Sequence, residues 1–377
     1  MREEIVNSEE ISPQKLFEKT WRVISRDYYE PSLNHQNWTR WKNRYQGKIK
    51  TIDDAKVAID SMIASLDEPY TRFMPQKDFE ELTTSITSKI YGIGVNIYSN
   101  SGKIEIFNVM PGTPADFAQL KQGDIIINVD GKDINGMNVS DVAAIVRGPE
   151  NSIVEITILR DNKKFTKRIK RKEIKIKSVK SSIIDNHIGY IKIISFMSGS
   201  TPNEFIEALN NTKNTDSLII DLRGNTGGLL DNAIFIADRF INRGTIVDII
   251  YRNGYKKSIK AQTGDNLLSD KPVVVLVNGA SASASEILSG ALKDYHRATL
   301  VGKKTFGKGL VQKVVPLPNK TGLNVTIARY LTPNGTDINK LGIKPDIEIG
   351  NDLDFLLENS KNDVQLEKAK EILNSSN

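Results

Sequence analysis

From about Asn186 onward, short apolar runs alternate with segments of helical pattern, and no other feature constrains the fold as strongly. Residues 273–277 are all Val or Leu, which is typical of a strand buried on both faces. Such alternation predicts an α/β layer whose functional groups lie at the ends of the strands. The predicted strands are residues 188–194, 217–222 and 273–277, and the predicted helices are residues 202–209, 229–240 and 283–292.

The first part of the chain has a helical pattern without such alternation. Apolar residues recur at helical spacing within residues 13–29, and again within residues 52–66 behind a start signal at Thr51 and Asp53. Pro69 disfavours helix at the residue before it and marks a turn. The first 85 residues are therefore predicted to be an all-helical region that ends near this turn.

Between these two regions the pattern is one of short strands separated by Gly and Pro. A turn at Asp130 and Gly131 and a helix cap at Asn138 or Ser140 mark internal boundaries. The segment is therefore predicted to be a small β-rich module with two helices. Its predicted strands are residues 92–97, 103–109, 124–129 and 153–159, and its predicted helices are residues 115–120 and 141–146.

These patterns divide the chain into four parts. Residues 1–85 form the helical N-terminal region, residues 86–172 the β-rich module and residues 173–350 the α/β core. Residues 351–377 form a tail that is predicted to be helical from Asp352 to Asn374. A length of 377 residues fits two or three domains.

Charge is concentrated in one stretch. The net charge is +6, and residues 163–180 hold ten Lys or Arg against a single acid, Glu173. Apolar and charged residues alternate at residues 174–177, which predicts the solvated face of a strand. No interleaved aromatic residues or nucleic-acid motif accompany these charges, so we expect no nucleic-acid partner.

Composition excludes several kinds of chemistry. The chain has no cysteine, so disulfides, thiolate catalysis and Cys-based metal sites are excluded. No apolar run approaches the ~18 to 20 residues of a transmembrane helix, and the acidic, polar start of the chain is unlike a secretory signal. We therefore expect no integral membrane segment. Either the protein is cytosolic, or it is exported by a signal that is absent from this chain. Nothing in the sequence indicates an oligomeric state.

The strand at residues 273–277 runs into a segment of small residues, 278–286, and then into a predicted helix. Small residues at a strand-to-helix turn let a ligand approach the backbone, and the start of a helix leaves amide groups unpaired. Such a turn can seat a serine nucleophile beside an oxyanion hole. The alternative is a serine-rich helix cap.

A serine nucleophile needs an adjacent base. The three histidines, His35, His187 and His296, carry no attached acidic motif, so a Ser-His-Asp triad is not indicated. Lys308 lies between Gly307 and Gly309 on a predicted turn. A free lysine is protonated at neutral pH, so this role requires burial of the amine, and the alternative is a surface lysine in a loop.

Residues 281–286 and 304–312 together resemble the active-site segments of the carboxyl-terminal processing (tail-specific) peptidases of family S41, and Lys308 follows Ser283 by 25 residues as in that family. The resemblance implies that Ser283 is the nucleophile and Lys308 the base. It also implies that Gln312 orients the lysine and that Glu286 has an active-site role. An acid favoured at the start of a helix is the alternative for Glu286.

A second block, residues 218–230, resembles the Asp-Leu-Arg-x-Asn-x-Gly-Gly signature of the same family. The amide of Gly227 or Gly228 would then join the amide of Ala284 in binding the tetrahedral oxyanion. Asp221 and Arg223 are expected to hold this turn. The block lacks the glycine patterns of nucleotide-binding loops. Further matches at residues 66–73, 330–335 and 342–347 extend the resemblance to about residue 348.

The β-rich module carries a resemblance of its own. Gly92, Ile93, Gly94 and Val95 resemble the carboxylate-binding loop of a PDZ domain, and residues 111–137 resemble the rest of such a domain. This implies that the module binds the C-terminus of a peptide that adds a strand to its sheet. Arg147 is either a solvated charge at the end of a helix or a contact that couples the module to the catalytic core.

The sequence thus predicts a ClpP/crotonase-like α/β catalytic core with a helical N-terminal region and an inserted β-rich PDZ domain. The expected function is that of a serine endopeptidase that recognises accessible protein C-termini and cleaves near them without a metal or organic cofactor. The alternatives are a non-catalytic PDZ adaptor and acyl-CoA chemistry on a related core. Family members usually work in the periplasm, at the envelope or in the thylakoid lumen, so an extracytoplasmic location is expected and a cytoplasmic one stays open.

Overall fold

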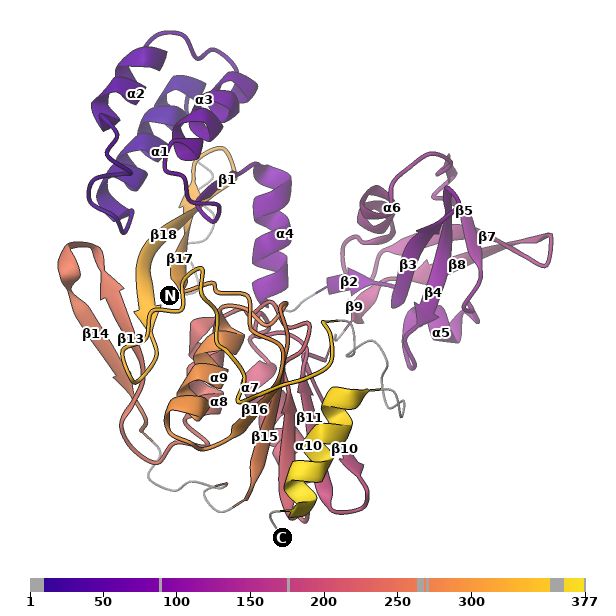
Figure 1. Cartoon of the computed structure of the whole chain (residues 1–377). Coiled ribbons are helices and arrows are strands. Elements are labelled where there is room, and N and C mark those ends of the chain that lie inside the picture. Colours follow the sequence, from indigo (N-terminus) through magenta and orange to yellow (C-terminus); the bar gives the residue numbers. More distant parts are fainter. Residues whose placement is uncertain are drawn as a thin grey trace. The chain divides into compact units, whose positions relative to one another are not determined.

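The computed structural model of the chain describes residues 10–87, 90–174, 177–262, 268, 271–352 and 363–375. Contacts divide the chain into two units (Figure 1). The main unit consists of Met1–Ile86 and Lys177–Asn377, and the inserted unit is Thr87–Ile176. The chain therefore leaves the main unit once and returns to it. Within the described residues, no helix combines the length and apolar character that crossing a membrane requires.

A six-stranded sheet with a parallel centre forms the middle of the main unit. Its strands lie in the order β10 (Val179–Ile184), β11 (Ile188–Ile193), β12 (Ser217–Asp221), β15 (Val273–Val277), β16 (Thr299–Gly302) and β19 (Ile347–Glu348), and only the β10–β11 pair is antiparallel. The connecting helices are α7 (Thr201–Asn211), α8 (Leu230–Ala237) and α9 (Ala284–Asp294). This arrangement confirms the predicted α/β layer.

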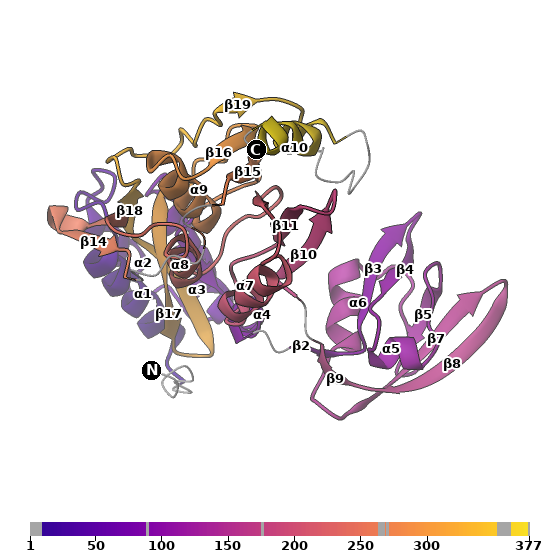
Figure 2. The same ribbon diagram turned by 90° about the horizontal axis from the view of Figure 1, so that it is seen from below.

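Helices cover both faces of this sheet (Figure 2). Val273, Val275 and Val277 pack into the core shared with α7, α8 and α9, whereas Val274 and Leu276 pack against α10 (Val364–Ser375). Because side chains of a strand alternate between its faces, covering both faces explains why residues 273–277 are apolar without interruption. The predicted helical tail is confirmed over α10, while residues 353–362 of that prediction lie outside the described residues.

A second sheet of the main unit was largely missed. It runs β1 (Arg72–Met74), β18 (Thr321–Leu331), β13 (Thr245–Tyr251) and β14 (Lys256–Lys260), and β17 (Leu310–Leu317) also pairs with β18. A one-turn 3₁₀ helix, η1 (Arg252–Gly254), joins β13 to β14. The end of the N-terminal region thus contributes a strand, because Phe73 pairs with Leu323 across 250 residues of chain, and no local pattern reveals such a partner.

The N-terminal helices pack on this second sheet. They are α1 (Pro13–Asp27), α2 (Trp38–Tyr45), α3 (Ile52–Ala64) and α4 (Gln76–Thr87). The start signal predicted at Thr51 and Asp53 is confirmed, because Thr51 caps α3 in a capping box with Asp54 and Asp53 lies in the first turn. Leu16, Phe17 and Ile59 are buried together with Leu323 and Val325 of β18. The apolar stripe of α1 is therefore what fixes this part of the chain on the sheet.

The inserted unit is a β-rich fold with two short helices. Its sheet runs β3 (Val95–Asn100), β4 (Lys103–Val109), β5 (Ile125–Val129), β7 (Ile153–Arg160) and β8 (Lys163–Lys170), with β6 (Lys132–Asp133) beside β5 and a separate pair of β2 (Ile90–Gly92) and β9 (Lys172–Ile174). The helices are α5 (Pro114–Phe117) and α6 (Val139–Val146), and Asn138, one of the two predicted caps, caps α6. Ile106, Val142 and Ile156 lie in its core.

The basic stretch contributes residues to the strands β8, β9 and β10, but of the alternating residues 174–177 only Ile174, the last residue of β9, lies in a described strand. Most of β8 is exposed, and only Ile169 among its residues is buried. Residues 175 and 176 of the predicted alternation lie outside the described residues. An edge strand rich in lysine also resists pairing with another chain, because its charges repel an incoming strand.

Candidate active site

Ser283 occupies the strained turn between β15 and α9. Its backbone has φ 55° and ψ −114°, in a region that residues with a side chain rarely adopt. The opposing loop approaches closely, since a Cβ on Gly227 would lie 2.7 Å from the carbonyl oxygen of Ala282 and 2.9 Å from Cβ of Ser283. Only glycine fits there, so the two predicted blocks meet at the serine.

Glu286 ties the serine turn to the lysine loop. Its carboxylate is fully buried and accepts four hydrogen bonds. Oε2 accepts from the main-chain N–H of Ser283 at 2.9 Å and of Lys308 at 2.8 Å, and Oε1 accepts from Thr305 Oγ1 at 2.6 Å and from Gly307 N–H at 2.7 Å. Burial raises the pKa of Glu286, and these four hydrogen bonds oppose the rise.

Tyr330 of β18 makes a second link between the same two segments. Its hydroxyl lies 2.6 Å from the carbonyl oxygen of Lys308 and 3.1 Å from that of Ser283, and its one hydrogen is shared between them. Tyr330 is almost completely buried. The sequence did not single out Tyr330 or Thr305 as site residues. The only signal was that residues 330–335 and 304–312 fall in segments that resemble the family.

Lys308 is partly buried, as a basic amine requires. Burial lowers the pKa of its ammonium, and Arg72 lowers it further, while Glu68 and Glu286 raise it. Its Nζ lies 4.8 Å from the centre of the Tyr70 ring. A lowered lysine pKa increases the fraction of neutral amine that can accept a proton near neutral pH.

Gln312 lines a pocket together with Ser283 and Lys308, but its side chain forms a hydrogen bond with neither of them. Its Nε2 donates to Thr326 Oγ1 at 3.3 Å, and Thr326 Oγ1 donates to Glu68 Oε2 at 2.7 Å. Across the residues that the structure describes, neither its amide oxygen nor Nζ of Lys308 has a hydrogen-bond partner. The oxygen of Gln312 is therefore available to accept a hydrogen bond.

The two candidate glycines differ in how their amides are used. Gly227 N–H donates to Asn225 Oδ1 at 2.9 Å. The amides of Gly228 and Ala284 have no partner in the part of the chain described here, although both residues line the pocket with Ser283. Two unpartnered N–H groups beside a serine can stabilise a negatively charged oxygen.

One pocket gathers most of the predicted catalytic residues. Ser283, Lys308 and Gln312 line it together with both glycines and Ala284, whereas Glu286 lies buried beside it. Its remaining wall is mainly apolar and includes Leu82, Met197, Leu229, Leu230, Ile287 and Val311. Among the residues the structure describes, no group of three or more His, Asp or Glu side chains could hold a metal ion.

Asp221 and Arg223 lie in a buried charge network, in line with the structural role expected for them. Arg223 Nη2 donates to Asp221 at 2.7 Å and to Asp363 at 2.9 Å, and Nη1 donates to Asp363 at 2.8 Å and to Gln365 at 3.1 Å. Tyr190 Oη donates to Asp221 at 2.6 Å. The network fixes the end of β12, from which the glycine loop starts, to the beginning of α10.

The inserted unit has a groove at its predicted binding loop. Gly92, Ile93, Gly94 and Val95 line it, and so do Met110, Ala143, Val146 and Arg147. A Cβ on Gly94 would lie 2.3 Å from Cβ of Thr113, and its φ is +88°, so the loop requires glycine at this position. Strand β3 lies at the edge of its sheet and can accept a further strand.

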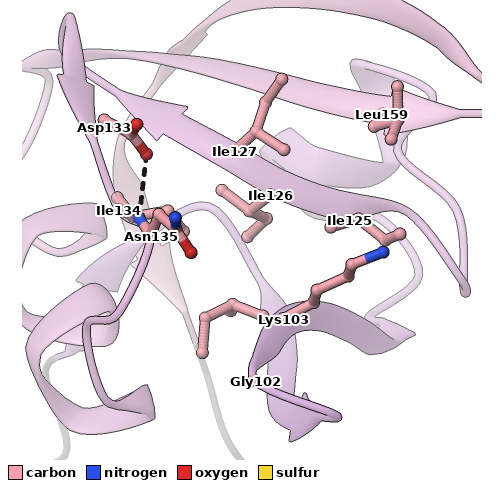
Figure 3. Close-up of a pocket in the computed structure, with 10 residues that line it drawn as sticks. Gly102, Lys103, Ile125, Ile126, Ile127, Asp133, Ile134, Asn135 and Leu159 are labelled. Carbon is pink, nitrogen blue, oxygen red and sulfur yellow. Dashed lines mark hydrogen bonds between the residues drawn. The ribbon is translucent and has the colours of Figure 1, made fainter.

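A second hollow of the inserted unit shares no residue with this groove. Figure 3 shows Ile125, Ile126 and Ile127 of β5 between Lys103 on one side and Leu159 on the other. Asp133 closes one end, where its Oδ1 accepts a hydrogen bond from Asn135 N–H at 2.9 Å. The predicted peptide-binding residues therefore lie in only one of the two hollows.

The chain is similar to known proteins along most of its length. The sequence pattern of peptidase family S41 matches residues 187–349, and that of a PDZ domain matches residues 105–160. A carboxyl-terminal-processing protease of Synechocystis is 37% identical over 374 residues, which cover 96% of this chain and 86% of that protein. The carboxy-terminal processing protease CtpA of Bacillus subtilis is 38% identical over 336 residues, covering 88% of this chain and 67% of that protein. A solved photosystem II D1 C-terminal processing protease is similar at 32% identity with a TM-score of 0.61, covering 91% of this chain and 94% of that one.

Proposed function

The chain belongs to the carboxyl-terminal processing proteases of peptidase family S41 and carries a PDZ domain, and on this premise we propose that it is a Ser-Lys endopeptidase guided by substrate C-termini. The observation that carries the proposal is that Ser283 and Lys308 line one pocket while a single carboxylate holds their main chains. Protein chains with accessible C-termini are the proposed substrates.

In the proposed reaction the neutral amine of Lys308 takes the proton of Ser283, whose oxygen attacks the scissile carbonyl carbon. The Lys308 ammonium then gives its proton to the leaving amine, and an acyl-enzyme remains on Ser283. Water, activated by the same amine, breaks the ester and restores the serine. Burial of Lys308 supports this role because it lowers the pKa of the ammonium.

We assign the oxyanion hole to the amides of Gly228 and Ala284. The Gly227 amide is already bonded to Asn225, whereas the other two are unpartnered within the described part of the chain. The role of Gly227 is then to allow the close approach of its loop to Ser283. Preorganised amides of this kind stabilise charge that develops in the transition state.

Glu286 and Gln312 are assigned different tasks. Glu286 bonds only main-chain groups and Thr305, so it positions the nucleophile and the base without touching the reacting atoms. Gln312 orients Lys308 by accepting a hydrogen bond from Nζ at its amide oxygen. This needs no change in its bond to Thr326, which uses the nitrogen of the same amide.

The PDZ groove is proposed to bind the substrate's terminal carboxylate at residues 92–95 while the peptide extends along β3. The apolar lining from Ile93, Met110 and Val146 supports a bound peptide side chain. We propose residues 86–172 as the limits of this domain and residues 173–350 as those of the peptidase core. An extracytoplasmic location is also proposed, as for the family.

Labelling with a fluorophosphonate probe tests the Ser-Lys assignment. The wild-type chain should be labelled at one serine, and Ser283→Ala and Lys308→Ala should abolish labelling while the proteins remain folded by circular dichroism. A non-catalytic PDZ adaptor would bind C-terminal peptides and show no labelling. Labelling of Lys308→Ala at the wild-type rate would remove Lys308 as the base.

A further inference from the structure

The amine of Lys308 has an aromatic neighbour in the N-terminal region. Nζ lies 4.8 Å from the centre of the Tyr70 ring, within the distance at which a ring face attracts a cation. No described residue forms a hydrogen bond or ion pair with this amine. Among the described residues, the Tyr70 ring is therefore the specific contact of this amine.

Tyr70 is held firmly in place by its main chain. Its N–H donates to Glu68 Oε1, and its carbonyl oxygen accepts from Asn324 Nδ2 at 3.2 Å. The other oxygen of Glu68 accepts from Thr71 N–H and Oγ1 and from Thr326 Oγ1. Because β1 follows directly and pairs with β18, the turn that carries the ring is anchored to the sheet that carries Gln312 and Tyr330.

The Tyr70 phenol is not needed for this anchoring. Its hydroxyl has no hydrogen-bond partner among the residues described, and the side chain is half-buried. What the ring offers Lys308 is its face. An aromatic face attracts the protonated ammonium and has little attraction for the neutral amine.

We propose that Tyr70 is a positioning residue for the general base, and that its ring holds the Lys308 ammonium between turnovers and sets the pH range over which the amine becomes neutral. The inference rests on the proposed Ser-Lys function and adds a residue that lies 238 positions away from the base in the sequence. It assigns the segment before β1 a part in catalysis beyond packing.

Other charged groups also act on the Lys308 amine, and substitutions of Tyr70 leave these groups unchanged. Glu68 belongs to the turn that carries Tyr70, Arg72 begins β1, and Glu286 approaches from α9. Glu68 and Glu286 favour the ammonium, whereas Arg72 and burial favour the neutral amine. The phenol of Tyr330 bonds the main chain of Lys308 and remains protonated, because burial holds its pKa well above the usual value.

The sign of the effect follows from the ring's preference for the cation. Replacing Tyr70 with Leu keeps an apolar group near the amine and removes the ring face, so the ammonium loses stabilisation and Lys308 becomes neutral at lower pH. Replacing Tyr70 with Phe keeps the face and should change nothing. Replacing it with Trp, the strongest aromatic partner for a cation, should act in the opposite direction.

The rate of fluorophosphonate labelling of Ser283, measured against pH, tests this inference without knowledge of the natural substrate. We expect the acid limb of the profile to move to lower pH by about half a unit or more in Tyr70→Leu and to higher pH in Tyr70→Trp. Tyr70→Phe should keep the wild-type limb, and so should Tyr255→Leu, a control at an exposed tyrosine. If either Tyr70→Leu or Tyr70→Trp fails to fold, the other variant still tests the shift of the acid limb.

An unchanged limb in Tyr70→Leu and Tyr70→Trp would overturn the role of Tyr70, and so would an equal shift in Tyr70→Phe. These outcomes are distinct from failure of the Ser-Lys function. That failure would appear as labelling of Lys308→Ala at the wild-type rate, whatever the Tyr70 variants show.

Discussion

The main-chain N–H groups of Ser283 and Lys308 donate to the same oxygen, Oε2 of Glu286, at 2.9 and 2.8 Å. The carbonyl oxygens of the same two residues both lie within hydrogen-bonding distance of the Tyr330 hydroxyl. The proposed nucleophile and the proposed base are thus positioned through their backbones by two buried side chains. Neither link uses the side chain of Ser283 or that of Lys308.

Glu286→Gln should lower kcat by about 100-fold or more with little change in KM. One oxygen of the carboxylate becomes an NH2 group, which cannot accept from N–H donors and displaces the lysine loop, and small displacements at a reacting centre have costs of this size. Steady-state kinetics on a cleaved protein measures both constants. Glu207→Gln, at an exposed glutamate, serves as the control, and a kcat within about twofold of wild type in Glu286→Gln would contradict the positioning role.

Activity should rise with pH, and the midpoint of this rise should lie below the pKa of free lysine, which is about 10.4. The direction follows because burial lowers the pKa of the Lys308 ammonium, so the neutral base appears at lower pH. Lys308→Arg should be inactive across the same range, because a guanidinium stays protonated. Initial rates measured from about pH 6 to pH 11 test both statements. A midpoint at or above the value for free lysine would contradict the role of burial.

Gly227→Ala should abolish cleavage and leave the fold intact. The added Cβ would lie 2.7 Å from the carbonyl oxygen of Ala282 and 2.9 Å from Cβ of Ser283, so one of the two loops must move. Gly254→Ala is a matched control, because Gly254 also has a positive φ, +77°, and its Cβ would meet nothing within 4 Å. The control should cost about 1 to 2 kcal/mol of stability and no activity. Equal activity in the two variants would show that the close approach at Gly227 is not required.

Asp363→Ala should destabilise the main unit by about 3 to 5 kcal/mol, because it removes two hydrogen bonds from the buried Arg223 guanidinium. Asp60→Ala removes the exposed pair with Lys56 and should cost less than about 1 kcal/mol. Urea unfolding followed by tryptophan fluorescence gives both values. A small cost for Asp363→Ala would mean that α10 does not fix the end of β12.

Three strands of the central sheet, β11, β12 and β15, could be predicted from the sequence because they are largely buried and rich in apolar residues, whereas β10, β16 and β19 were not predicted. The bounds predicted for β15, residues 273–277, are those found. Strand β18 was missed although residues 323–327 alternate apolar with polar; two of its three partners, β1 and β13, lie far along the chain. Strand pairs of this kind are stabilised by distant residues, and a local pattern does not contain them.

Part of the candidate site could likewise be predicted from the sequence, and part could not. Ser283 and Lys308 were identified through their neighbours in sequence and their spacing. The preference for Gly228 over Gly227 depends on the bond between Gly227 N–H and Asn225, and the contact of Tyr70 with Lys308 depends on β1 pairing with β18. Both follow from the folded arrangement, which explains why the sequence left the two glycines open and did not single out Tyr70.

Mass spectrometry of model proteins with unstructured C-terminal tails tests the central claim most directly, with each protein incubated with the wild-type chain and with Ser283→Ala. We expect the wild-type chain to release fragments cut near the C-terminus, and expect fewer when the terminal carboxylate is amidated. Ser283→Ala should release none while it still binds the tail peptide. Cleavage by Ser283→Ala at the wild-type rate would contradict the assignment of Ser283 as the nucleophile.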